Sequence, residues 1–111
     1  MKLITWNVQW CRGCDGRVDP ARIVAHARAL ADFDVLCLQE VAANFPGLDG
    51  SRGENQFGIL ARLLPGYTAI PAAAVDTLAP DGSRRAFGNL ILSRYPVAQA
   101  LRIQLPWPSD P

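Results

Sequence analysis

The sequence has few of the features that mark membrane-spanning or strongly nucleic-acid-binding proteins. Lys2 is the only lysine, His26 is the only histidine, and the formal net charge of the 111 residues is +1. So balanced a charge provides no broad positive surface for a polyanion. No apolar run approaches the roughly 20 residues that span a bilayer, so we predict no membrane-spanning segment.

Cysteine is also scarce, and its placement limits the chemistry to be expected. The chain has three cysteines, and polar residues interrupt any apolar signal sequence near its start, which predicts a cytoplasmic protein with free thiols. Cys11 and Cys14 form a Trp-Cys-x-x-Cys pattern, which suggests a thioredoxin-like redox protein as an alternative. In that fold the first cysteine begins a helix, whereas Asp15-Gly16 predicts a turn here. Redox chemistry is therefore the weakest alternative.

The first part of the chain predicts a strand, a helix and a second strand. Residues 2–8 alternate in polarity, and Val35 to Leu38 is continuously apolar, as in a strand covered on both faces. Between them, Asp19 and Pro20 predict the start of a helix that runs to about Ala31. This order is a βαβ crossover, in which the two strands are parallel. Their carboxyl ends meet at one edge of the sheet, where ligands bind in such folds.

Two polar residues lie at these strand ends. Asn7 ends the first strand and Glu40 follows the second, so we expect them to converge on one site. An amide oxygen beside a carboxylate suits Mg²⁺, with Mn²⁺ as a substitute. Glu40 is the candidate metal ligand, and Asn7 is a second ligand or a donor that orients a phosphate oxygen or a water. The structural alternatives are that Glu40 caps the next loop and Asn7 forms a turn.

The rest of the chain predicts a short helix and a run of strands. Residues 42–55 predict a loop, and Gln56 to Leu64 predicts a helix stopped by Pro65-Gly66. Further strands are predicted at residues 67–75, 87–93 and 97–105, with a turn at 80–83 and an extended proline-rich tail at 106–111. The hairpin spacing favours antiparallel pairing. Such a mixed sheet leaves one face uncovered, so residues 1–111 are interpreted as part of a larger domain, with an exposed strand edge that invites self-association.

Three stretches carry recognisable motifs. They are Ile-Thr-Trp-Asn-Val at residues 4–8, Asp-Val-Leu-Cys-Leu-Gln-Glu-Val at 34–41, and Phe-Gly-Asn-Leu-Ile-Leu-Ser-Arg-Tyr-Pro-Val at 87–97. In this order and spacing they resemble the start of the endonuclease/exonuclease/phosphatase superfamily. The resemblance implies an α/β fold with a mixed sheet, the N-terminal half of a four-layered α/β-sandwich. It also implies that the C-terminal half of the domain, with its Asp-x-Asn and Ser-Asp-His motifs, is absent from residues 1–111.

The same resemblance implies a Mg²⁺-dependent hydrolase of phosphoester bonds, a nuclease or a phosphodiesterase or phosphatase. It assigns the metal to Glu40 and places Asn7 in the active site, while Asn89 and Arg94 are candidate substrate-binding residues. The expected partner is a phosphoester substrate, with nucleic acid among the candidates. His26 lies on the crossover helix and is not expected to be catalytic. Because the family's general base belongs to the absent motifs, a non-catalytic interaction module with the same fold is the main alternative.

Overall fold

The computed structural model describes residues 1–44, 48–78, 80, 82 and 84–96 of the chain. The strand predicted at 97–105, the tail at 106–111 and part of the turn at 80–83 lie outside the described residues. The elements, in chain order, are β1 (Leu3–Asn7), α1 (Pro20–Leu30), β2 (Val35–Ala43), α2 (Gln56–Leu63), β3 (Thr68–Leu78) and β4 (Arg84–Ser93).

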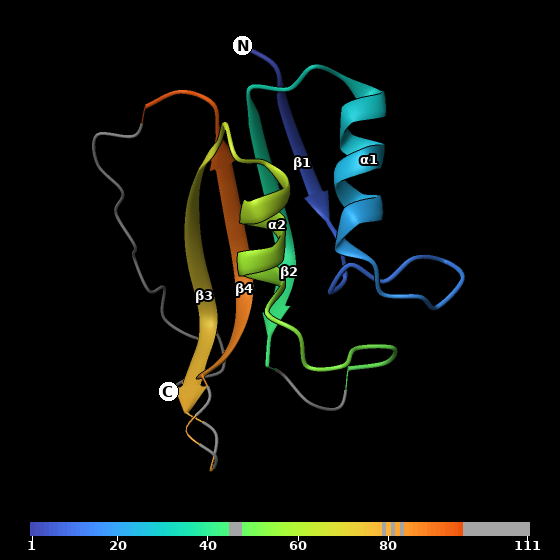
Figure 1. The fold of residues 1–111 in the computed structure, drawn as a ribbon, viewed down its shortest axis with the longest axis vertical. Helices are drawn as coiled ribbons and strands as arrows, with labels where there is room; N and C mark the ends of the chain where they lie inside the picture. Colours follow the sequence, from blue (N-terminus) through green and yellow to red (C-terminus); the bar gives the residue numbers. More distant parts are fainter. Residues whose placement is uncertain (45–47, 79, 81, 83, 97–111) are drawn as a thin grey trace, which may run out of the picture.

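The described strands form one mixed sheet of four strands in the order β1-β2-β4-β3 (Figure 1). β1 and β2 are parallel, with Leu3 opposite Val35 and Asn7 opposite Gln39. β4 lies between β2 and β3 and is antiparallel to both. The predicted βαβ crossover, the mixed sheet and the α/β class are therefore confirmed.

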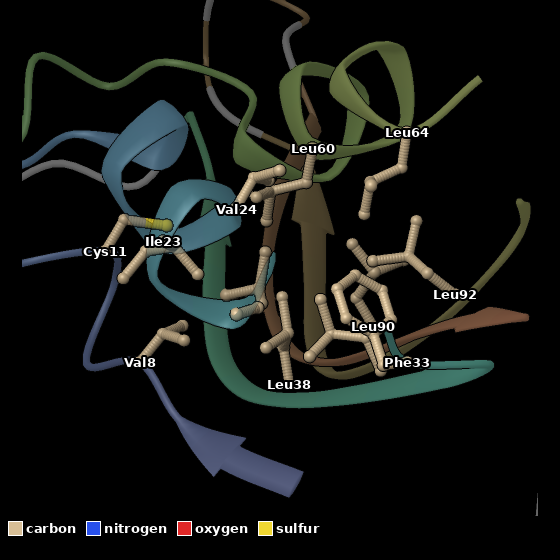
Figure 2. Packing of buried hydrophobic residues seen from close by; sticks show 13 residues of the cluster. Val8, Cys11, Ile23, Val24, Phe33, Leu38, Leu60, Leu64, Leu90 and Leu92 are labelled. Carbon is tan, nitrogen blue, oxygen red and sulfur yellow. The ribbon is translucent and has the colours of Figure 1, made fainter. Parts of the chain in front are cut away.

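Both helices pack on the same face of the sheet (Figure 2). The core between them and the strands is built from apolar side chains that are fully or almost fully buried. They include Ile23 and Val24 of α1, Leu60 of α2, Leu38 of β2 and Leu90 of β4. Along β1 and β4 the side chains alternate between this core and the opposite face. No described helix covers that opposite face, which we call the open face.

The ends of α1 agree with the sequence prediction, and those of the strands differ from it. Asp19 caps α1 by accepting hydrogen bonds from the backbone N–H groups of Ala21 and Arg22, and Pro20 is the first helical residue. β2, however, continues to Ala43, where the sequence predicted a loop from residue 42. An irregularity in the pairing of β2 with β4 between Leu38 and Val41 lets the strand continue after its polar residues.

β1 and β3 are the edge strands of the described sheet. Self-association through such an edge stays a prediction. Within the described ranges, no helix is long and apolar enough to cross a membrane.

Candidate functional site

The candidate site lies on the open face, where the parallel pair β1 and β2 ends. Asn7 is the last residue of β1, and its side chain is exposed on that face. Its neighbour in the register is Gln39, whose side-chain amide donates to Thr5 Oγ1 on the same face at 3.0 Å. Polar side chains from two adjacent strands therefore meet at the carboxyl ends, as in other sheets that bind ligands there.

Asn7 and Glu40 are in direct contact. Asn7 Nδ2 donates a hydrogen bond to Glu40 Oε2. Asn7 Oδ1 in turn accepts the backbone N–H of Gln9 at 3.1 Å. The N–H of Gln9 needs an acceptor, and the oxygen is the only acceptor in the side-chain amide of Asn7. This bond therefore fixes the amide so that its nitrogen faces Glu40. One carboxylate oxygen of Glu40 therefore accepts a hydrogen bond from Asn7, and the other oxygen is not engaged by Asn7.

The backbone at Glu40 has an unusual conformation. Its φ is +59°, in the left-handed region that residues other than glycine and asparagine rarely adopt. Leu38 pairs with Leu90 and Val41 with Gly88, so two residues of β2, Gln39 and Glu40, stand opposite one residue of β4. This is a β-bulge, a feature that redirects a side chain at the end of regular pairing.

The β4 residue opposite the bulge is Asn89. It is exposed, while its neighbours Gly88 and Leu90 are buried on the helix side. Asn89 therefore lies on the open face at the level of Glu40. The structure brings three of the four candidate residues to one region, from three neighbouring strands.

A second left-handed segment lies directly after β1. Gln9, Trp10 and Cys11 have φ angles of +51°, +45° and +59°. Three such residues in succession are strained, because each costs roughly 1–2 kcal/mol relative to ordinary backbone. The segment is tied to β2 by the backbone N–H of Trp10, which donates to the carbonyl of Glu40 at 2.7 Å. Trp10 also donates from its indole Nε1 to the carbonyl of Asp49 at 2.9 Å.

The sequence analysis missed Gln56, the first residue of α2, which is fully buried next to this segment. Its side chain bonds to the carbonyl of Trp10 and to the N–H of Ala42. One sequence signal could have revealed it, because Gln56 stands one turn before Leu60 on the stripe of α2 that faces the core. A glutamine on such a stripe needs internal partners.

Arg94, the fourth candidate, is not brought to this region. Its backbone N–H donates to the carbonyl of Asp34, just before β2 begins, so it lies at the opposite end of β2 from Glu40. Its guanidinium bonds to Asp32 Oδ1 at 2.7 Å and to the hydroxyl of Tyr67 at 2.8 Å. These partners, Asp32 first, raise the pKa of Arg94 above its usual value. These contacts show that Arg94 links the segment before β2 to the segment before β3, at the end of β2 opposite Glu40.

His26 lies on α1, which packs on the face of the sheet opposite the candidate site. It is exposed on α1, and its ring stacks on Trp6 with 6.3 Å between centroids. Within the described part of the chain, no hydrogen bond, ion pair or ring contact joins His26 to Asn7 or Glu40.

The donors at the site fit a hard divalent cation held by one carboxylate. Among the described residues there is no group of three or more His, Cys, Asp or Glu side chains that would hold a metal by themselves. Mg²⁺ usually takes only one or two protein carboxylates and keeps several waters. The second carboxylate oxygen of Glu40 meets this need. The amide oxygen of Asn7 already accepts from Gln9, so Asn7 fits better as a donor that orients Glu40 than as a ligand.

A hollow of about 500 Å³ lies elsewhere, between the loops that follow β1 and β2. It is lined by Gly16, Arg17, Val18, Pro20, Gly50, Arg52 and Glu54. The carboxylate of Glu54 accepts from Ser51, from the backbone of Arg52 and from Gln56, so it is already engaged. We therefore place the candidate site at the Asn7–Glu40 pair and not in this hollow.

The structure argues against thioredoxin-like chemistry at Cys11 and Cys14. Cys11 is completely buried, and its sulfur points into the core beside Ile23 (Figure 2). Burial, followed by the negative charges of Glu54 and Asp19, raises the pKa of Cys11 to about 12. A redox-active cysteine needs the reverse, an accessible thiol with a lowered pKa. Cys14 alone is exposed.

The cysteines give a test of this arrangement. At pH 8 Ellman's reagent should modify Cys14 first, and Cys11 only when the protein is unfolded.

Because the pKa of Cys11 rises from 9.0 to about 12 on folding, its contribution to stability is full below pH 9 and is lost as pH rises toward 12. Urea unfolding at pH 8 and pH 10 measures this loss. A Cys11→Ala variant should lose less stability between these pH values, and an equal loss in both proteins would contradict the assignment.

Comparison with known proteins gives a consistent result. The model of the Endonuclease/Exonuclease/phosphatase family matches residues 4–108. No curated protein matches the chain. Among solved structures, an endonuclease/exonuclease/phosphatase from Beutenbergia cavernae DSM 12333 is 34% identical with a TM-score of 0.68, over 88% of this chain. A family protein from Leptotrichia buccalis C-1013-b is 20% identical with a TM-score of 0.57, over 89% of this chain, and shows the fold alone. The chain spans 27% and 39% of the lengths of these two proteins.

Proposed function

The chain belongs to the Endonuclease/Exonuclease/phosphatase family, and from this premise we propose that it carries the Glu40 half-site of a Mg²⁺-dependent hydrolase of phosphoester bonds. Proteins of this family generally hydrolyse such bonds. The observation that carries the proposal is the contact between Asn7 and Glu40 at the ends of two parallel strands. A carboxylate fixed by a neighbouring amide at this edge is suited to hold a cation against a phosphate group.

Glu40 is the metal ligand in this proposal. Bound Mg²⁺ supplies charge neutralisation for the phosphoryl oxygens as negative charge develops in the transition state. Glu40 accepts from Asn7 with one oxygen, and its other oxygen would hold the cation. The bulge supports this role, because regular pairing would leave the side chain of residue 40 in a different direction.

Asn7 and Asn89 act on the substrate side of the same site. Asn7 Nδ2 carries two hydrogens, of which Glu40 accepts one, so among the described residues the second is left to donate to a phosphate oxygen. Asn89 is exposed on the open face opposite the bulge, where its amide can reach the substrate. Together they orient the ester without carrying charge.

Activation of the attacking water requires further groups. Among the described residues, Glu40 is not part of any group of three or more His, Cys, Asp or Glu side chains. We propose that residues 1–111 form the N-terminal part of a longer domain and that the general base comes from its other part. The shares of 27% and 39% of the two similar structures support this reading. We propose that the substrate is a phosphodiester or phosphomonoester, nucleic acid included. We also propose that the protein is cytoplasmic.

Hydrolysis of bis(p-nitrophenyl) phosphate by the complete protein tests the proposal. Activity should fall at least ~10²-fold in excess EDTA, because the charge stabilisation of the transition state is lost, and should return with Mg²⁺ or Mn²⁺. Activity that is equal in chelator and in Mg²⁺ would contradict the metal role. Absence of hydrolysis with every phosphoester, under conditions where Mg²⁺ binds, would favour the non-catalytic interaction module.

A further inference from the structure

Gln56 is a fully buried polar side chain whose amide bonds to three different segments. Its Oε1 accepts the backbone N–H of Ala42 in β2 at 3.0 Å. Its Nε2 donates to the carbonyl of Trp10 at 2.8 Å and to Glu54 Oε1 at 3.0 Å. Within the described ranges, only Gln56 and Ser93 are buried polar residues. A glutamine in such a place is stable only because each of these bonds is made.

We infer that Gln56 is a positioning residue for Glu40, an inference that rests on the proposed function of that carboxylate. Among the described residues, the side-chain hydrogen bonds of Gln56 go to Ala42, Trp10 and Glu54 and not to Glu40. Gln56 acts on the backbone from the Glu40 carbonyl onward, through Trp10, whose N–H donates to that carbonyl, and through the N–H of Ala42.

The first connection runs through Trp10. The N–H of Trp10 donates to the carbonyl of Glu40 at 2.7 Å, and the carbonyl of Trp10 accepts from Gln56 at 2.8 Å. The peptide groups on both sides of Trp10 are thus fixed, one by the bulge and one by the helix that begins at Gln56. Trp10 needs this support because it is the middle residue of the left-handed segment.

The second connection runs through Ala42, two residues after Glu40. Its N–H is directed to Gln56 Oε1. The C-terminal end of the bulge is therefore held twice, by the bond from Trp10 to the Glu40 carbonyl and by the bond from Ala42 to Gln56. Bonds of this kind hold Glu40 at φ +59°, from which the backbone would otherwise relax toward an extended conformation.

Relaxation of this backbone would move the carboxylate. The direction of the Cα–Cβ bond follows φ and ψ, so a return of Glu40 to regular pairing would turn its side chain away from Asn7. Supporting groups around a metal ligand typically change metal affinity by 10–100-fold when they are lost. Gln56 has this position relative to Glu40, although its bonds are to the backbone.

Gln56→Met tests the inference, because methionine has nearly the same shape and no hydrogen-bonding amide. In this chain, titration with MgCl₂ followed by NMR at Glu40 should give a dissociation constant raised about 10-fold or more. Without metal, hydrogen exchange at the Trp10 amide should quicken, although Gln56 does not bond to that N–H. Leu60→Val, a buried change on the same helix, is the control and should leave both measurements near those of the unchanged protein.

Each outcome decides the question. Unchanged Mg²⁺ affinity and unchanged Trp10 exchange in Gln56→Met would overturn the inference, as would equal changes in Leu60→Val. If Gln56→Met does not fold, Gln56→Asn replaces it, because its amide is one methylene too short to join Trp10 and Ala42 at once. If the unchanged chain binds no Mg²⁺, the proposed metal role of Glu40 fails by itself, and Trp10 exchange alone then supports or overturns the role of Gln56.

Discussion

Replacing Glu40 with glutamine should lower the proposed phosphoesterase turnover of the complete protein at least ~10²-fold, the range expected when a key electrostatic stabiliser of the transition state is removed. Glutamine keeps the size of the side chain and can still accept from Asn7 Nδ2. What it loses is the negative charge that binds the cation. Because the fold is left in place, the loss should appear in kcat at saturating substrate, and higher Mg²⁺ should recover only part of it.

Asp49→Asn is the matched control for this substitution. It also removes one carboxylate, in the loop that follows β2, and within the described ranges the side chain of Asp49 makes no hydrogen bond or ion pair; its backbone carbonyl accepts from the indole of Trp10. Its turnover should stay near that of the unchanged enzyme. Near-normal turnover of Glu40→Gln, with circular dichroism showing an intact fold, would remove Glu40 from the catalytic site.

Replacing Leu38 with alanine should lower the free energy of unfolding by about 3–5 kcal/mol, the range for a large side chain deleted from a rigid core. Leu38 is fully buried and lies between the helices and the sheet (Figure 2). The neighbouring side chains cannot easily close the cavity that alanine would leave. The pairing of Leu38 with Leu90 and of Val41 with Gly88 fixes the strands on both sides of the bulge. A loss of this size is a large fraction of the stability of a typical domain.

Leu30→Ala makes the same chemical change at an exposed place. Leu30 is 72% exposed at the end of α1, so its truncation should change the unfolding free energy by less than about 0.5 kcal/mol. Urea titrations extrapolated to water give both values. Similar losses in the two variants would mean that the core of the folded chain is not the cluster described above.

The meeting of Asn7 and Glu40 could be predicted because it follows from topology. A helix between two strands makes them parallel, and parallel strands carry their last residues to the same edge. The capping of α1 was equally accessible, since Asp19 and Pro20 act through local bonds. These features depend on neighbours in sequence or on rules that hold for every crossover.

The conformation at Glu40 could not be predicted in this way. A glutamate has no local preference for left-handed backbone, so tertiary bonds alone impose it. The polar pair Gln39 and Glu40 suggested that β2 ends at Leu38, whereas the bulge lets it continue to Ala43. The placement of Arg94 failed for a related reason. Its partner Asp32 lies 62 residues earlier in the chain, and no local pattern indicates that contact.

The strand order β1-β2-β4-β3 has a consequence for how the chain matures during synthesis. β2 acquires its second neighbour only when β4 is made, because β4 lies between β2 and β3. Roughly 50 residues separate the end of β2 at Ala43 from the end of β4 at Ser93. At typical rates of translation, that is a delay of roughly 3–10 s. During this interval the unpaired backbone edge of β2 is open to other nascent chains, so slow translation or crowded polysomes would favour aggregation of this protein before its sheet is complete.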